Sequence, residues 1–249
     1  MTKVISFINH KGGTGKTTSV INIGSALAKK GYKTLLVDLD SQANLSEGLG
    51  VFDAEQTLYT TFKNKSVIPE HFIAENLYLR PSNLDLVGFE FDVARHDYKE
   101  TVLKKLLPKV IDKYDYVLFD LPPTLSTLVF NALVISKYVC IPMQVEFFAY
   151  RGLDRIMEVI KTVKENSNPD IELLGVFLTQ FNNSRTITNM IKDAVNNNFE
   201  GKLFKTKIRV NVKLVEAQAQ GESIFDYDES SAGAKDYEDL TNEILTSLN

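Results

Sequence analysis

Short apolar runs alternate with amphipathic stretches along most of this chain. The runs are β-branched or aromatic and nearly continuous, which is typical of strands buried on both faces of a parallel sheet. They cover residues 4–9, 34–39, 77–80, 116–120, 138–143 and 173–179. Helical periodicity marks the stretches 17–30, 99–113, 124–136 and 152–166. This alternation predicts a wound α/β fold, with a mostly parallel sheet and helices on both faces.

The composition is that of an average globular protein. Of the 249 residues, 44% are hydrophobic and 24% are charged. No apolar run approaches the roughly 18 residues of a membrane-spanning helix, which excludes an integral membrane protein. The one cysteine, Cys140, excludes a disulfide scaffold, a cysteine zinc site and a cluster that needs two cysteines per subunit. We therefore expect a single domain over residues 1–249 in a reducing, cytoplasmic setting.

A glycine-rich loop joins the first predicted strand to the first predicted helix. Its sequence is Lys11-Gly12-Gly13-Thr14-Gly15-Lys16-Thr17-Thr18. In this position, backbone N–H groups without obstructing Cβ atoms wrap phosphates, and the helix N-terminus adds partial positive charge. Lys16 is expected to reach the β- and γ-phosphates of a nucleotide, and the Thr17 hydroxyl is expected to hold Mg²⁺. The loop departs from the usual pattern because His10 stands at the first glycine position, while Lys11 precedes the glycine pair.

Carboxylates follow two of the predicted strands. Asp38 and Asp40 lie two residues apart at the end of a predicted strand, and we expect only one of them to face a nucleotide. Asp120 ends the hydrophobic run 116–119, where a carboxylate can hold Mg²⁺ directly or through water. Pro122 and Pro123 then give a stiff exit from the strand, because proline fixes φ and lacks an N–H.

The loop resembles the deviant Walker A motif, K-G-G-x-G-K-[ST], of the ParA/Soj/MinD ATPases. Four further stretches resemble the ParA/Soj partition branch in order and spacing: 35–44 (LLVDLDSQAN), 120–124 (DLPPT), 141–146 (IPMQVE) and 211–217 (NVKLVEA). The resemblance covers nearly the whole chain and implies an α/β fold of the P-loop NTPase type, with ATP and Mg²⁺ as cofactors. The final predicted helix, 232–248, carries acids on its polar face, which disfavours the membrane-targeting MinD branch. No membrane partner is expected.

The resemblance also assigns roles to single residues. In the family, the lysine matching Lys11 reaches across an ATP-bound dimer to the partner's phosphates, where it acts like an arginine finger supplied in trans. Asp40 takes the switch I position, orienting the attacking water or assisting the metal, while Asp38 supports the loop and Asp120 begins switch II. The expected catalytic residues are Lys11, Lys16 and Asp40, and the expected metal ligands are Thr17, Asp40 and Asp120.

Adenine contacts are implied near residues 209–211, where family members often present a proline and an asparagine. Asn211 is retained, whereas Arg209 stands at the proline position. Asn182 is a second candidate. With these two asparagines, the expected nucleotide-binding set comprises Lys11, Gly12, Gly13, Thr14, Gly15, Lys16, Thr17, Thr18, Asn182 and Asn211.

The net charge of −4, from 28 basic and 32 acidic residues, argues against a protein covered in nucleic-acid-binding charge. The total hides two segments of opposite sign. Residues 202–213 hold five basic residues and no acid, while 214–243 hold nine acids and one lysine. In ParA/Soj-like proteins, basic residues near this segment bind non-specific DNA in the ATP dimer. The candidate DNA contacts are Lys213 and Arg209, followed by Lys205 and Lys207, with Arg185 as a further candidate.

The leading hypothesis is an ATP-dependent dimer that partitions plasmid or chromosomal DNA on the nucleoid, with slow hydrolysis stimulated by a ParB-like adaptor. The loop begins after ten residues, so no N-terminal helix-turn-helix domain is expected. One alternative is a ParA-like ATPase that positions a protein cargo, which the active-site residues do not distinguish from the first. The other is a metabolic P-loop synthetase, for which the sequence offers no organic-substrate motif.

Overall fold

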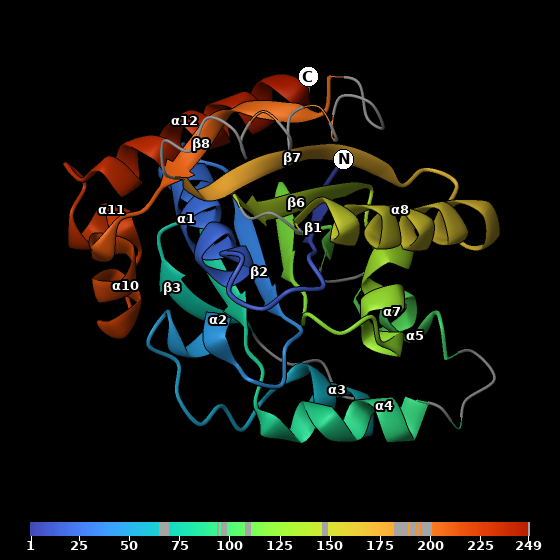
Figure 1. Cartoon of the computed structure of the whole chain (residues 1–249). Coiled ribbons are helices and arrows are strands. Elements are labelled where there is room, and N and C mark those ends of the chain that lie inside the picture. The colour runs from blue at the N-terminus through green and yellow to red at the C-terminus, as the bar shows by residue number, and fades with distance from the viewer. Residues whose placement is uncertain are drawn as a thin grey trace.

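A sheet of eight strands runs through the computed structural model, with helices on both of its faces (Figure 1). The structure describes residues 1–64, 70–93, 95, 99–107, 111–145, 149–181, 189, 193, 195 and 201–248. The strands are β1 (Lys3–Phe7), β2 (Thr34–Asp38), β3 (His71–Ala74), β4 (Leu77–Arg80), β5 (Tyr116–Asp120), β6 (Tyr138–Gln144), β7 (Glu172–Phe181) and β8 (Leu203–Arg209). Their order is β3-β4-β2-β5-β1-β6-β7-β8. Every neighbouring pair is parallel except β3–β4.

The predicted α/β fold is confirmed, and each of the six predicted runs overlaps a strand. All residues of β2 and β5 are buried, which explains why these strands appear in the sequence as unbroken apolar runs. Alternate side chains enter different cores: Val117 and Phe119 belong to one cluster, and Tyr116 and Leu118 to the other. The sheet is therefore covered on both faces.

The helices divide between the two faces. The described helices are α1 (Lys16–Lys29), α2 (Asn44–Glu47), α3 (Leu58–Asn64), the 3₁₀ turn η1 (Leu84–Leu86), α4 (Val87–Val93), α5 (Val102–Leu106), α7 (Thr127–Ile135), α8 (Ala149–Asn166), α10 (Val212–Ala219), α11 (Ile224–Tyr227) and α12 (Ala232–Ser247). Apolar residues of α4, α5, α7 and α8 fill one core, whereas those of α1, α10, α11 and α12 fill the other. Figure 1 shows α7 and α8 on the side of the sheet opposite α1 and α12. Within the described part of the chain, no helix has both the length and the apolar character needed to cross a lipid bilayer.

Two strands were missed by the sequence analysis. β3 pairs antiparallel at one edge and has only four residues, two of them exposed. β8 lies at the other edge, inside the segment interpreted as a basic surface. Edge strands of this kind expose part of one face, so their charged positions mask the apolar pattern. The helix predicted at 99–113 is also shorter than expected: α5 ends at Leu106, and residues 108–110 lie outside the described residues.

Helix α12 closes the β8 edge with carboxylates. Glu243 accepts hydrogen bonds from the backbone N–H groups of Lys205 (2.7 Å) and Thr206 (3.0 Å), and Asp236 accepts one from Arg209 (3.0 Å). These bonds satisfy donors that an edge strand would otherwise present to another chain. The acidic tail thus has a structural role against the basic strand.

The topology brings the carboxyl ends of three neighbouring strands together at one end of the sheet. β5 lies between β2 and β1, with Asp38 and Phe7 each in register with Asp120. Because the strands are parallel, the chain leaves all three at the same carboxyl end of the sheet, which is where ligands bind in open α/β sheets.

Candidate functional site

The glycine-rich loop connects β1 to α1 at that end of the sheet. Gly13 and Gly15 have φ angles of 73° and 82°, which glycine adopts without the penalty of a Cβ atom. A Cβ added at Gly12 or Gly13 would meet no atom within 4 Å, so the loop backbone faces open space. The N-cap residue of α1, Gly15, has no side chain to cap the helix, which leaves its first N–H groups available to an anion.

A cavity of about 790 Å³ opens above this loop. Its size is that of a ligand site for a molecule as large as a nucleotide. Five parts of the chain line it: the loop and the start of α1, the segment after β2, the segment after β5, the end of β7, and α10. The lining residues include Gly12, Gly13, Gly15, Lys16, Thr17, Thr18, Asp40, Ser41, Gln42, Pro122, Thr124, Gln180, Val215, Gln218 and Ala219.

Lys16 is buried at the floor of this cavity, 7% exposed. Its Nζ donates to the carbonyl oxygen of Lys11 at 3.3 Å. Burial lowers the pKa of Lys16, and the nearby Asp120 and Asp40 carboxylates partly oppose this effect. A cation desolvated in this way gains strongly from an anionic ligand, since burial increases electrostatic attraction.

Thr17 and Asp120 form a hydrogen-bonded pair in which the Thr17 hydroxyl donates to Asp120 Oδ2 at 2.6 Å. The other carboxylate oxygen, Oδ1, is buried and has no hydrogen-bond partner among the described residues. Burial first, and then the nearby Asp38 carboxyl, raise the pKa of Asp120 well above its usual range. A hydroxyl beside a buried carboxylate with one unsatisfied oxygen is a donor set that suits a small divalent cation such as Mg²⁺.

The two aspartates after β2 have different environments. Asp38 is fully buried and accepts hydrogen bonds from Ser46 N (2.9 Å), Ser46 Oγ (2.7 Å) and Asp40 N (3.1 Å). Burial raises its pKa to about 6. Asp40 instead lines the cavity, and its Oδ1 accepts from Gln42 N at 3.0 Å. The structure therefore places Asp38 under the loop and Asp40 beside the ligand space.

Lys11 lies on the outer side of the loop. Its Nζ donates to Gln144 Oε1, at the end of β6, at 3.4 Å, and its backbone N–H donates to Asn9 Oδ1 at 3.0 Å. The side chain of Asn9 in turn donates to the carbonyl oxygen of Pro142 at 2.7 Å. The first half of the loop is thus tied to β6 through Asn9 and Lys11.

The expected adenine contacts fare differently. Asn211 caps α10, with its Oδ1 accepting from Lys213 N at 2.9 Å, and it is not among the described residues that line the cavity. Asn182 lies outside the described residues. The sequence analysis missed Gln218, which lines the cavity and accepts a hydrogen bond from the Thr18 hydroxyl at 2.9 Å. The only signal for it in the sequence is that it directly follows the stretch 211–217.

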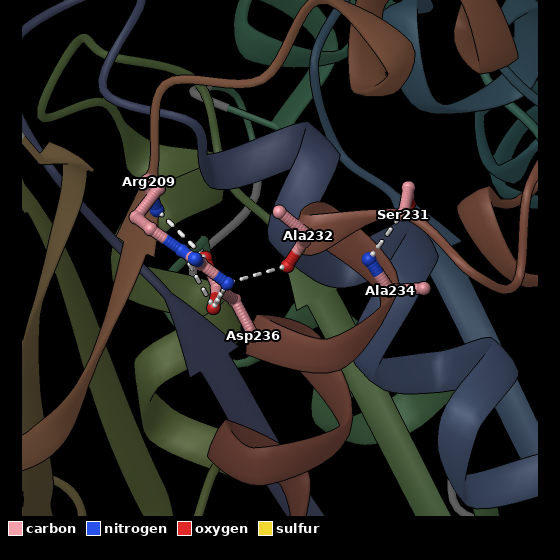
Figure 2. Close-up of polar contacts among 5 residues, drawn as sticks. All are labelled: Arg209, Ser231, Ala232, Ala234 and Asp236. Carbon is pink, nitrogen blue, oxygen red and sulfur yellow. Dashed lines mark hydrogen bonds and ion pairs between the residues drawn. The ribbon is translucent and has the colours of Figure 1, made fainter.

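The basic candidates occupy β8 and α10. Figure 2 shows Arg209 engaged with α12: its Nε donates to Asp236 Oδ2 at 2.9 Å and its second terminal nitrogen to Oδ1 at 2.7 Å. Lys213 pairs with Glu216 at 2.8 Å, and the Lys207 ammonium lies 4.4 Å from the centre of the Phe181 ring. Lys205 is exposed, and Arg185 lies outside the described residues.

Comparisons with known proteins agree with this geometry. A family model described as an AAA domain matches residues 2–173. The chain is 39% identical over 252 residues to the chromosome-partitioning ATPase Soj of Treponema pallidum and 37% identical over 249 residues to the sporulation initiation inhibitor protein Soj of Bacillus subtilis, and each match covers 98% of both proteins.

Two similar solved structures hold a bound nucleotide. A crystal structure of cobyrinic acid a,c-diamide synthase from Mycobacterium smegmatis with bound ADP and magnesium matches with a TM-score of 0.85 and 29% identity, over 100% of this chain and 96% of that one. A putative plasmid partition protein from Borrelia burgdorferi, bound to AMPPNP, matches with a TM-score of 0.84 and 26% identity, over 99% of both chains.

Proposed function

Because the chain belongs to the Soj/ParA family of partitioning ATPases, we propose that it partitions plasmid or chromosomal DNA as an ATP-dependent homodimer on the nucleoid. The ATP-bound dimer binds DNA without sequence preference. A ParB-like adaptor stimulates its slow hydrolysis, and the P-loop domain described above carries these activities in a cytoplasmic protein.

The enzyme is an ATPase that uses ATP and Mg²⁺. Backbone N–H groups of residues 12–16 bind the phosphates, and buried Lys16 neutralises part of their charge. The Thr17 hydroxyl and Asp120 would hold Mg²⁺, which would supply positive charge near the phosphate oxygens. Asp40, which lines the cavity, orients the attacking water, and Asp38 fixes the loop that carries Asp40 through its bonds to Ser46.

The observation that carries the dimer proposal is the position of Lys11. It is not among the described residues that line the cavity of its own subunit, and its Nζ donates to Gln144 Oε1, at the end of β6, at 3.4 Å. A lysine placed outside its own ligand cavity is positioned to reach a phosphate held by a second subunit. Each subunit then completes the other's site, which couples ATP binding to dimerisation.

The DNA contacts are proposed on β8 and α10. Lys213 and Glu216 are both about two-fifths exposed, and a surface pair of this kind is weak enough for a DNA phosphate to replace Glu216. Arg209 is bound as a fork to Asp236, which is only 9% exposed, and breaking that pair leaves a poorly solvated carboxylate. The contacts therefore favour Lys205, Lys207 and Lys213 over Arg209 as DNA ligands.

Sedimentation of the wild type with ATP or ADP, with and without random-sequence DNA in low salt, tests the proposal. We expect an ATP-dependent dimer that binds DNA, loss of both properties in Lys16→Ala, and loss of DNA binding alone in Lys213→Glu. Lys104→Glu, which makes the same charge change on exposed α5, is the matched control. DNA affinity should fall with salt, with a log–log slope of roughly −0.9 per phosphate neutralised. Monomers that ignore nucleotide and DNA would refute the partition proposal.

The likeness to the Mycobacterium smegmatis diamide synthase, at 29% identity, favours one other candidate, an amide-forming synthetase. ATP turnover separates the two. A partitioning ATPase is stimulated by a DNA-binding adaptor, for which a small protein encoded beside this one is the first to test. A synthetase hydrolyses ATP in response to an organic acid and a nitrogen donor, with no effect of DNA.

A further inference from the structure

Two glutamine side chains converge on one carbonyl group of the phosphate-binding loop. The oxygen of Gly13 accepts a hydrogen bond from Gln144 Nε2 at 2.7 Å and another from Gln180 Nε2 at 2.9 Å. These residues come from different strand ends, Gln144 from β6 and Gln180 from β7. Next to them, the Thr179 hydroxyl donates to the carbonyl oxygen of Thr14 at 2.8 Å. Both lone pairs of the Gly13 oxygen are thus used.

The geometry of the peptide unit links these hydrogen bonds to the direction of the next backbone N–H group. In a planar trans peptide, the C=O of one residue and the N–H of the next point in opposite directions. Side chains that hold the Gly13 oxygen toward β6 and β7 therefore direct the Thr14 N–H to the other side of the loop. The Thr179 bond does the same for the Gly15 N–H. Gly13 has a φ of 73°. Because glycine adopts positive and negative φ about equally readily, the residue itself does little to fix the orientation of this peptide.

Gln180 is itself held in an unusual conformation. Its φ is 47°, in the left-handed region that costs a non-glycine residue about 1 kcal/mol or more. It also lines the cavity. A residue kept in such a conformation beside a ligand site is stabilised by its surroundings, and the described partner of its side chain is the Gly13 oxygen.

Gln144 has a second contact. While its Nε2 donates to Gly13, its Oε1 accepts from Lys11 Nζ at 3.4 Å. One side chain therefore bridges the loop peptide and the lysine that precedes the glycine pair. An amide is suited to this because it offers a donor and an acceptor at one end.

We propose that Gln144 and Gln180 are positioning residues that hold the Gly13 carbonyl outward and so direct the Thr14 N–H, and with Thr179 the Gly15 N–H, toward a bound phosphate. The loop is then ordered before the nucleotide arrives, and less conformational entropy is lost on binding. The inference rests on the proposed nucleotide site but not on the dimer or the DNA contacts.

The test measures binding of ADP and of adenosine, which lacks phosphates, to Gln144→Met, Gln180→Met and the double variant. Methionine keeps the length of the side chain and removes the N–H donors. We expect each single variant to bind ADP roughly threefold to tenfold more weakly, as the loss of one neutral hydrogen bond predicts, and the double variant more weakly still. Adenosine affinity should stay within about twofold. The matched control is Gln220→Met, an exposed glutamine that is not among the described cavity-lining residues.

A second readout follows the peptide itself. In the wild type, ADP should shift the Thr14 amide resonance downfield in a ¹⁵N-correlated NMR spectrum, and the double variant should show a smaller shift at saturating ADP. ADP affinity in the double variant equal to that of the wild type would overturn the proposal while leaving the nucleotide site intact. Equal losses for ADP and adenosine would also overturn it, since they would indicate a general distortion of the cavity.

Discussion

Glu90 offers the sharpest test of how distant side chains hold the switch region. Helix α7 begins at Thr127, shortly after the proposed metal ligand Asp120, and its N-cap residue, Ser126, makes no side-chain capping bond. The carboxylate of Glu90, on α4, takes that place by accepting from Thr127 N at 3.2 Å and from Leu128 N at 3.0 Å. One side chain thus caps the helix that follows the Asp120 strand.

The expected magnitude follows from these two bonds. A hydrogen bond to a charged group contributes about 1.5–3 kcal/mol, and a negative charge at a helix N-terminus adds about 0.3–1 kcal/mol. Water replaces part of this in the variant, so Glu90→Ala should lower the free energy of unfolding by about 2–3 kcal/mol. Glu90→Gln keeps one acceptor oxygen and should lose about half as much.

Urea unfolding and hydrogen exchange of the nucleotide-free chain together measure the effect. With a slope of about 3 kcal/mol per M, the midpoint of Glu90→Ala should fall by roughly 0.7–1 M, and peptides covering 124–131 should exchange faster than in the wild type. Glu158→Ala removes an exposed glutamate from α8 and should change neither. The capping role would be refuted by a midpoint that stays within about 0.2 M of the wild type, a difference on the order of experimental error, together with unchanged exchange at 124–131.

Three further predictions concern buried contacts. Burial raises the pKa of Asp38 from 3.8 to about 6, so the folded chain binds an extra proton, and this group's contribution to the free energy of unfolding, about 3 kcal/mol, should be lost as the pH rises through this window. In nucleotide-free urea titrations Asp38→Asn should reduce the slope of stability against pH and leave the part due to Asp120, whose pKa burial also raises; an unchanged slope would contradict the assignment. Gly24→Ala places a Cβ 2.5 Å from Leu36 Cδ2 and should lower the free energy of unfolding in urea by about 1–2 kcal/mol, although alanine has the better helix propensity. Adding Leu36→Val should relieve part of this loss, and strictly additive losses of the two variants would contradict the contact. Arg209→Ala leaves the nearly buried Asp236 without its guanidinium partner. This variant should lose about 1–2 kcal/mol of unfolding free energy, seen as a fall of several degrees in the thermal midpoint. Arg209→Lys should not restore the midpoint, and full recovery by lysine would show that the two-pronged Arg209–Asp236 contact is unimportant.

The sequence was most informative where a structure depends on neighbouring residues. Continuous apolar runs indicated the buried parallel strands, because each such strand has both faces covered. The glycine-rich loop could be recognised because its spacing, the strand before it and the helix after it are all local. Strand alternation does not separate Asp38 from Asp40, because residues two apart in a strand share a face. The expectation that Asp40 faces the nucleotide came from the resemblance, and the structure separates the two because β2 ends at Asp38 and the chain turns before Asp40.

Residues whose roles depend on long-range packing could not be found in this way. Strand β8 was missed because its exposed positions carry Lys205 and Arg209, and the order of the strands is what places it at a sheet edge. The pairing of Arg209 with Asp236, 27 residues later in the chain, could not be predicted, because only the packing of α12 on β8 brings the two together. Gln218 reaches the cavity only because α10 packs beside the start of α1.

The amino-acid sequence by itself therefore determined the fold class, the phosphate-binding loop and the carboxylates at the strand ends, since each depends on short-range spacing and on the burial of contiguous residues. The tertiary structure decided which side chains hold those parts in place: Glu90 on α7, Gln144 and Gln180 on Gly13, and the carboxylates of α12 on β8. A hydrogen bond needs two groups about 3 Å apart, and no spacing along the chain specifies that distance between residues that only the folded sheet brings together.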